Sequence, residues 1–301
     1  MRTKAIRLAL LFSALLIVAC GGSSNNPRVL PPDPSPPLAT NLALRFFGTG
    51  ANNVDRVLIA LAAPSNAGNV SLPVNIGAGD FTIEFWLKGN LADNVTPSCF
   101  GQQAKDAWRL GNIVLDRDVA GDGDRGEYGV SLRNGTIAFG AAKGAFGTTL
   151  CGGRNVLDGN WHHVAVTREV TSGTLAIFVD GALDMSMANV AASGDISYRV
   201  ERSGAATDPF LVVGAEKTDS PALAAFNGLL DELRLSTRLR YTGTFTRPGG
   251  PFSVDGNTAA LYHFNEGSGA TVVIDAVGPS PGLLSVGGPS NGPAYVTDVP
   301  F

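Results

Sequence analysis

Alternating apolar and polar positions recur along the chain after its first twenty residues. In residues 81–88, Phe81, Ile83, Phe85 and Leu87 alternate with Thr, Glu, Trp and Lys. This period of two predicts a strand with one face toward a core, because successive side chains of a strand point to opposite faces. The same alternation in shorter segments predicts further strands at 42–46, 128–132 and 175–179.

Turn residues separate these segments. Asn134-Gly135 and Asp180-Gly181 are short-hairpin signals, because Asn, Asp and Gly tolerate the positive φ that such turns need. The chain after residue 20 shows no sustained apolar spacing of three and four, and Gly makes up 38 of its 301 residues. We therefore predict an all-β fold in which two antiparallel sheets pack face to face as a sandwich.

The first twenty residues follow a different pattern. Basic residues precede an apolar run over 8–19, which is too short to cross a bilayer as a stable helix. Residues 1–19 are therefore predicted to be a signal peptide. The end of the run, Ile17-Val18-Ala19-Cys20, resembles a lipobox, which implies that Cys20 is diacylated and becomes the mature N-terminus. An ordinary secretory signal that happens to contain a cysteine is the alternative.

Residues 20–40 are rich in Gly, Ser, Asn and Pro, with six prolines between positions 27 and 37. This composition buries too little apolar surface to fold, so we predict a tether with a reach of roughly 50 Å in extended geometry. The folded domain is then expected over 41–301. Gly21 follows Cys20, where no Asp stands, and by resemblance to envelope lipoproteins this favours transport to an outer membrane.

The charge of the chain limits its partners. Without the three basic residues of the signal, 19 Lys and Arg stand against 26 Asp and Glu, a formal charge of −7. Phosphate binding is driven by clusters of Lys and Arg, and none is visible here. We therefore expect no nucleic acid as a partner, and membrane contact only through the lipid.

Two cysteines, Cys99 and Cys151, remain in the exported part of the chain. An even pair in an oxidising compartment predicts a disulfide. Closing this loop would remove on the order of 4 kcal/mol of unfolded-state entropy. Two buried free thiols are the alternative.

A more specific similarity is carried by four segments: 81–86, 158–167, 178–181 and 228–234. They resemble, in this order, the motifs of laminin-G-like, concanavalin-A-like jelly rolls, and the resemblance covers about residues 41–240. It implies a jelly-roll sandwich. The residues Leu261 to Gly269 resemble a motif more often found at the start of such domains. We expect the tail, 255–301, to add closing strands to the same sandwich, with a truncated second domain as the alternative.

Catalytic residues are not apparent. The enzymes related to this family carry closely spaced acids on one strand, and glycoside hydrolysis normally needs two carboxylates across the scissile bond. Glu84 and Glu232 each lack an acidic partner two residues further along. His162 and His163 lie in the motif around Trp161, which is structural in the family. We therefore predict no catalytic residues and a protein that is not an enzyme.

A structural calcium ion is one expectation for the acidic residues. Straight alternation from Leu229 to Leu235 places Asp231 on the core face, where an unpaired carboxylate is costly. Calcium is common in this superfamily, and the resemblance makes Asp55 a second ligand. The alternative is that Asp231 accepts backbone N–H groups or pairs with Arg56.

A second acidic group lies in the loop 116–127. Counted from Asp116, its acids and a glycine resemble the spacing of an EF-hand loop. The flanking residues predict strands instead of helices, so a solvated hairpin loop is favoured over a calcium loop. The metal-ligand candidates of this loop are Asp116, Asp118, Asp122 and Asp124.

These patterns favour a non-catalytic, surface-anchored recognition module that binds a glycan or a protein. Trp86, opposite the core face of its strand, and Trp108, in a polar loop, are candidates for stacking on sugars, although a covering sheet or loop is favoured for Trp86. The alternatives are a glycoside hydrolase with unrecognised catalytic acids and a purely structural envelope protein.

Overall fold

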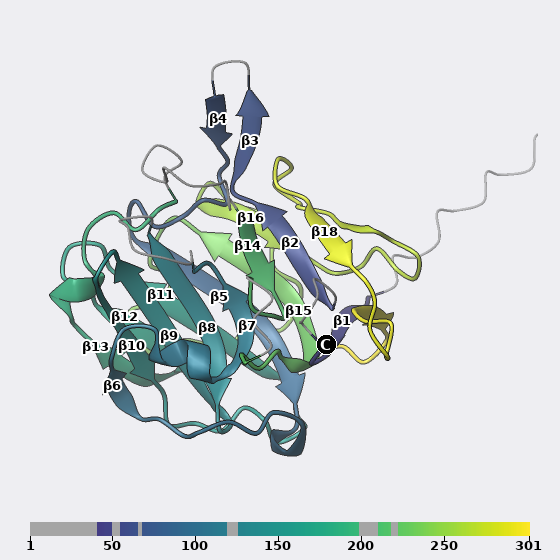
Figure 1. Ribbon diagram of the computed structural model, residues 1–301, viewed down its shortest axis with the longest axis horizontal. Helices are drawn as coiled ribbons and strands as arrows, with labels where there is room; N and C mark the ends of the chain where they lie inside the picture. Colours follow the sequence, from purple (N-terminus) through teal and green to yellow (C-terminus); the bar gives the residue numbers. More distant parts are fainter. Residues whose placement is uncertain (1–40, 50–54, 66–67, 119–125, 199–209, 218–221) are drawn as a thin grey trace, which may run out of the picture. The chain divides into compact units, whose positions relative to one another are not determined.

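The computed structural model describes residues 41–49, 55–65, 68–118, 126–198, 210–217 and 222–301. They belong to one compact unit, Ala39–Phe301, built from antiparallel sheets (Figure 1). The predicted fold class, an all-β antiparallel sandwich, is confirmed. Cys20 and the predicted signal peptide and tether lie outside the described residues. None of the described residues forms a helix long and apolar enough to span a membrane.

The first sheet, which we call sheet A, has the strand order β13-β12-β11-β5-β15-β1-β19 in the described part of the chain. β1 pairs with the first half of β15, and β16 pairs with the second half. The strands are β1 (Ala43–Phe47), β5 (Phe81–Gly89), β11 (His162–Arg168), β12 (Leu175–Val179), β13 (Ala182–Met187), β15 (Asn227–Ser236), β16 (Thr258–Tyr262) and β19 (Ala294–Val296).

The second sheet, sheet B, has the order β17-β18-β2-β14-β7-β8-β9-β10-β6 among the described residues. Its strands are β2 (Arg56–Ala60), β6 (Gly101–Gln103), β7 (Asn112–Asp116), β8 (Glu127–Arg133), β9 (Thr136–Lys143), β10 (Phe146–Cys151), β14 (Phe210–Val213), β17 (Val272–Val273) and β18 (Gly282–Ser285). A separate hairpin and three short 3-10 segments complete the described elements: β3 (Ala62–Ser65), β4 (Gly68–Ser71), η2 (Leu91–Asp93), η3 (Ala107–Leu110) and η4 (Val190–Ala192).

The core lies between the two sheets, as the alternation predicts. On β5, the apolar positions 81, 83, 85 and 87 all point into one buried cluster that is shared with sheet B. The ring of Phe81 lies 5.4 Å from that of Tyr128 and 6.1 Å from that of Phe139, which joins the layers. The hairpin turns are also as predicted, with Asn134 and Asp180 at φ of 49° and 51°.

The tail strands belong to the same two sheets. β16 and β19 extend sheet A, while β17 and β18 extend sheet B beside β2. The core is therefore closed by residues that follow the four similar segments, because the last strands of both layers come from the end of the chain.

A strap covers the outer face of sheet B. The strap, residues 97–111, contains the edge strand β6 and then η3, which lies against β7, β8, β9 and β10. The disulfide between Cys99 and Cys151, whose Cα atoms are 5.8 Å apart, ties the strap to β10. Arg133 holds the strap further by donating to the carbonyl of Pro97 at 2.7 Å. The indole of Trp108 lies directly over Gly129 and Gly140, where a Cβ atom would overlap the ring. The predicted disulfide is present.

Replacing Gly140 with alanine tests this packing. The new methyl group would force the Trp108 ring off the sheet, and overpacking of this kind costs about 1–3 kcal/mol. We expect the free energy of unfolding in urea to fall by this amount. The matched control is Gly79→Ala, because a Cβ there meets nothing within 4 Å and should leave stability nearly unchanged. Equal stabilities for the two variants would contradict the packing described here.

Candidate functional site

Glu84 is the centre of a buried network on the outer face of sheet A. Its carboxylate accepts hydrogen bonds from Arg234 Nε at 2.9 Å, Tyr241 Oη at 2.7 Å and, from the neighbouring strand, His163 Nε2 at 3.2 Å. Burial alone would raise the pKa of Glu84, but the hydrogen bond from His163 and the charge of Arg234 outweigh it and lower that pKa. The carboxylate is therefore ionised and holds together β11, β15 and the segment that carries Tyr241.

The network fastens the segment 237–257 across sheet A. Tyr241 stacks on Phe245 at 3.5 Å, and both pack against Phe178 of β12. Arg234 lies 4.5 Å from the centre of the Phe252 ring. Much of the outer face of sheet A is therefore covered by the chain itself, because these aromatic residues lie on top of the strands.

Both tryptophans proposed as sugar-stacking residues are buried. Trp86 is 2% exposed beneath Phe252 and Trp108 is 2% exposed beneath its strap. A ring covered to this extent has no face for a ligand, so the prediction that they bind a ligand is wrong. The favoured interpretation of Trp86, that the second sheet or a loop covers it, is confirmed, since Phe252 of the segment 237–257 packs on it.

The predicted orientation of Asp231 is also wrong. A β-bulge between Asp231 and Arg234, with Glu232 at a φ of 55°, shifts the alternation by one position. Asp231 therefore lies opposite Trp86 on the outer face, while Leu230 and Leu233 point into the core.

Asp231 is nevertheless fully buried, and neither carboxylate oxygen has a hydrogen-bond partner of normal geometry. Burial, and then the negative charge of Glu232, raise the pKa of Asp231 to about 8. The favoured state of this side chain at neutral pH is the protonated acid. The alternative pairing with Arg56 is not observed.

The two predicted calcium ligands do not come together. Asp55 accepts from the backbone N–H of Phe47 at 2.7 Å, and Phe47 pairs with Asn227 at the start of β15. Asp231 lies four residues further along the same strand, which corresponds to about 13 Å. The structure thus leaves Asp231 without Asp55 as a second carboxylate ligand.

An acidic cluster forms at one end of sheet B. Asp106, Asp118 and Glu127 each place one oxygen within 4.8 Å of the others. Lys105 approaches Glu127 at 3.2 Å and Arg109 approaches Asp118 at 2.9 Å, so the cluster already contains two cations. Burial, followed by the charge of Asp118, raises the pKa of Glu127 to about 7.

The remaining acidic residues of the predicted loop do not join this cluster in the described part of the chain. Asp116 is fully buried and accepts from the backbone N–H groups of Asp118 and Lys217, at 2.7 and 3.0 Å. Burial raises the pKa of Asp116 to about 7. Asp122 and Asp124 lie outside the described residues. Sequence reasoning missed Asp106, because it comes from the strap and not from the loop.

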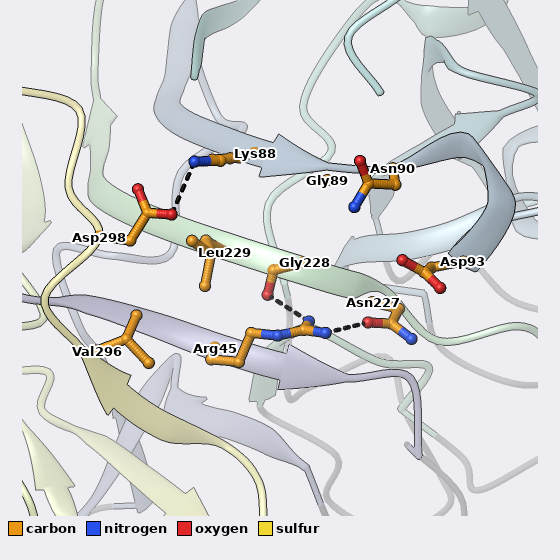
Figure 2. A pocket seen from close by; sticks show the side chains of 10 residues that line it. All are labelled: Arg45, Lys88, Gly89, Asn90, Asp93, Asn227, Gly228, Leu229, Val296 and Asp298. Carbon is orange, nitrogen blue, oxygen red and sulfur yellow. Dashed lines mark hydrogen bonds and ion pairs between the residues drawn. The ribbon is translucent and has the colours of Figure 1, made fainter. Parts of the chain in front are cut away.

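A polar pocket of about 320 Å³ opens at the margin of sheet A, and we call it the Arg45 pocket (Figure 2). Four strands form it, because β1, β15 and β5 lie side by side and β19 flanks β1. Its charged side chains are Arg45, Lys88, Asp93 and Asp298, and the remaining lining residues are Gly89, Asn90, Asn227, Gly228, Leu229 and Val296.

Arg45 is half-buried and held in place by neutral groups. Its guanidinium donates to the carbonyls of Phe46 and Gly228 and, at 2.6 Å, to Asn227 Oδ1, and it lies 4.7 Å from the centre of the Phe47 ring. Burial, only partly offset by the more distant charges of Asp93 and Asp55, lowers the pKa of Arg45. Among the described residues it forms no ion pair.

Asn94 fixes the wall opposite Arg45. This fully buried amide donates to the carbonyls of Asn90 and Asn227 at 3.1 and 2.7 Å, and accepts from the backbone N–H of Asn227 at 2.9 Å. On another wall, Lys88 pairs with Asp298 at 2.7 Å (Figure 2). The frame of the pocket is therefore held by hydrogen bonds and an ion pair within the chain itself.

Sequence reasoning missed this pocket. Its one local signal is Arg45, a charged residue between the core residues Leu44 and Phe46, which places it on the outer face of β1. Its partners Asn227 and Gly228 lie 182 and 183 positions further along the chain, and no spacing in the sequence indicates them.

The family model of the concanavalin A-like lectin/glucanases superfamily matches residues 64–242, more than half of the sequence. The chain belongs to this superfamily. No curated protein matches the sequence. Within the superfamily fold, the Glu84 network joins three of the four segments that carry the similarity, since Glu84, His163 and Arg234 each lie in one of them.

Solved structures show more distant similarities. A protein from Bacteroides ovatus proposed to bind carbohydrate is 15% identical, with 83% of this chain and 59% of that chain covered and a TM-score of 0.49. A pentraxin from Limulus polyphemus is 14% identical and has a TM-score of 0.42; the match covers 66% of this chain and 77% of the pentraxin chain. Mouse laminin α1 domains LG4-5 are 13% identical and have a TM-score of 0.40; the match covers 76% of this chain and 51% of the laminin chain. These similarities carry no argument about function.

His162 bridges two carboxylates, with Asp180 at 2.7 Å from Nδ1 and Asp158 at 3.0 Å from Nε2. Burial alone would lower the pKa of His162, but its hydrogen bonds to Asp180 and Asp158 outweigh that effect and raise it. The protonated form is therefore favoured by folding. Protonated His162 stabilises the fold fully below its pKa in the unfolded chain, about 6.5. This stabilisation is lost as the pH rises through the higher pKa of His162 in the folded protein.

Replacing His162 with glutamine should remove this pH dependence. The free energy of unfolding of the wild type is expected to fall more steeply than that of His162→Gln as the pH rises above about 6.5, because only the wild type loses the proton. Urea denaturation at several pH values measures both slopes. The comparison cancels the contribution of His263, which both proteins retain. Parallel slopes would contradict a raised pKa of His162.

Proposed function

We propose that the protein is a non-catalytic recognition module that binds a glycan or protein ligand in the Arg45 pocket. The observation that carries this proposal is the preorganised frame of the pocket, in which Asn94 and the strand pairing fix polar groups that face solvent. Fixed polar groups in a hollow of this size suit ligand binding, because little entropy is lost when the ligand arrives.

The bonding of two buried glutamates supports a binding function. Glu84 accepts three hydrogen bonds and lies 3.5 Å from Arg240, and Glu232 accepts from the N–H of Phe252 at 2.7 Å and contacts His263 at 2.6 Å. These two carboxylates fasten segments of the chain, and neither lines the Arg45 pocket.

We propose that the chain is exported and anchored through Cys20 to the outer membrane.

Binding of the purified full chain to an array of glycans tests the proposed function. Specific binding that is lost when a bulky side chain fills the pocket, as in Val296→Trp, would support it if far-ultraviolet circular dichroism shows the variant to be folded. The milder variant Leu229→Gln, at the apolar floor of the pocket, provides a second measurement. Absence of binding to both glycans and envelope proteins would favour a purely structural role.

Turnover is the outcome that the proposal excludes. Incubation of the full chain with a panel of polysaccharides should release no reducing ends above the background of a heat-denatured sample. Release that disappears in a folded Asp93→Asn or Asp298→Asn variant would establish a hydrolase, because these are the carboxylates of the pocket.

A structural calcium ion at Asp231 is a separate proposal. The two unpartnered oxygens of Asp231 fit a cation that prefers oxygen ligands, although six to eight oxygens are normal and the rest would have to come from backbone carbonyls. A chelator should then lower the melting temperature of the wild type, by about 2–4 °C for each kcal/mol of binding free energy, and should not change that of Asp231→Asn. An unchanged wild-type melt would contradict calcium at this position.

A further inference from the structure

We infer that the Arg45 pocket selects a neutral, polyhydroxylated ligand, a sugar ring whose hydroxyl groups bridge Arg45 and Asp93. This inference rests on the proposed function and narrows its ligand class. It follows from the charges of the pocket, the positions of its unpaired polar groups and its apolar floor.

Arg45 and Asp93 are opposite charges that do not pair. Both line the pocket, yet Arg45 forms no ion pair within 4 Å among the described residues, and Asp93 affects it only through a longer-range charge interaction. The Asp93 side chain makes no hydrogen bond in the described part of the chain. Figure 2 shows the carboxylate of Asp93 on the side of the pocket that faces the guanidinium.

The space between these two groups needs a ligand atom that both donates and accepts. Arg45 offers only donors and an ionised Asp93 only acceptors. A hydroxyl group accepts from the guanidinium and donates to the carboxylate at the same time. Adjacent hydroxyls on a sugar ring can bond to both Arg45 and Asp93. Both hydrogen bonds are charge-assisted, and such bonds are stronger than those between neutral groups.

Charged ligands fit the pocket less well. The pocket carries two cations, Arg45 and Lys88, and two anions, Asp93 and Asp298, so its formal charge is balanced. An acidic sugar at Arg45 would place its carboxylate next to Asp93, and an amino sugar at Asp93 would place its ammonium next to Arg45. Like charges at such a distance oppose binding.

Two amides complete the polar lining. Asn227 uses Oδ1 to hold Arg45, which leaves its Nδ2 without a hydrogen bond among the described residues. The exposed Asn90 side chain is likewise unbonded in the described part of the chain, while Asn94 fixes its backbone. Each amide can therefore bond to a ligand hydroxyl without breaking an internal hydrogen bond.

Leu229 and Val296 provide an apolar surface between the polar groups. The carbon-bound hydrogens of a sugar ring can pack on such side chains, while its hydroxyls reach the rim. The volume of about 320 Å³ lies at the lower end of the range for small-molecule pockets. It suits a single sugar residue, either free or as one unit of a longer glycan.

A glycan array divided into neutral, acidic and amino-sugar groups tests the inference, with affinities of any hits measured by calorimetry on the full chain. We expect hits among the neutral glycans, with an affinity that changes little between low salt and about 0.5 M salt, because a neutral ligand is not screened. Arg45→Gln and Asp93→Asn should each weaken binding by about tenfold or more, as expected for loss of a charge-assisted hydrogen bond.

Two variants outside the pocket serve as controls. Arg154→Gln removes an exposed arginine whose nearest carboxylate is 3.9 Å away, and Glu169→Gln removes an exposed carboxylate on the turn after β11. Both should bind as the wild type does. Asp93 is exposed and makes no side-chain hydrogen bond among the described residues, so Asp93→Asn tests the pocket even if Arg45→Gln reduces stability.

The outcomes separate this inference from the proposed function. Binding of acidic glycans that strengthens in Asp93→Asn would overturn the neutral ligand and keep a recognition module. Binding of neutral glycans at wild-type affinity by both pocket variants would place the site elsewhere and overturn the role of this pocket. No glycan binding, together with binding of a protein ligand, would overturn the sugar and leave recognition as the function.

Discussion

The ion pair between Glu84 and Arg234 is the interaction on which the outer layer of the molecule depends. Both residues lie on the outer face of sheet A, where a charge on a bare sheet would be solvated. The chain instead covers them with the segment 237–257, and Tyr241 and His163 complete the coordination of the carboxylate. Removing one partner of a buried pair typically costs 3–5 kcal/mol, since the other charge stays buried. The carboxylate of Glu84 thus holds the segment 237–257 in place, and this segment shields the ion pair from solvent.

Each sheet is covered by a segment of its own chain, and this limits where a ligand can bind. Trp108 and its disulfide-linked strap occupy the outer face of sheet B, while Tyr241, Phe245 and Phe252 occupy that of sheet A. The Arg45 pocket lies beyond the covered area of sheet A, where the first and last strands pair. Recognition is therefore expected at a margin of the sandwich and not on a broad sheet face.

The sequence was sufficient for the fold and insufficient for the pocket. Alternation at 81–88 and the turns at Asn134 and Asp180 act over a few residues, so local pattern predicts them correctly. The predicted orientation of Asp231 was wrong because of one bulge residue, Glu232. A bulge moves every later side chain of the strand to the opposite face of the sheet, and the pattern of apolar residues in the sequence does not show where it occurs. Trp108 had a signal that was not used, since two glycines on neighbouring strands leave room for a large ring. The Arg45 pocket depends on pairing between the two ends of the domain, which a single sequence does not reveal.

The pairing of β1 with β19 also has a mechanical consequence. Arg45 lies on the first described strand, directly opposite Ala294 of the last strand. A pull on the chain before residue 41 reaches β1 first and loads its hydrogen bonds to β15 and β19 before those of any other strand. Tension would therefore act first on the strand that carries Arg45, so the Arg45 pocket is the part of the domain most directly exposed to force from the N-terminal side.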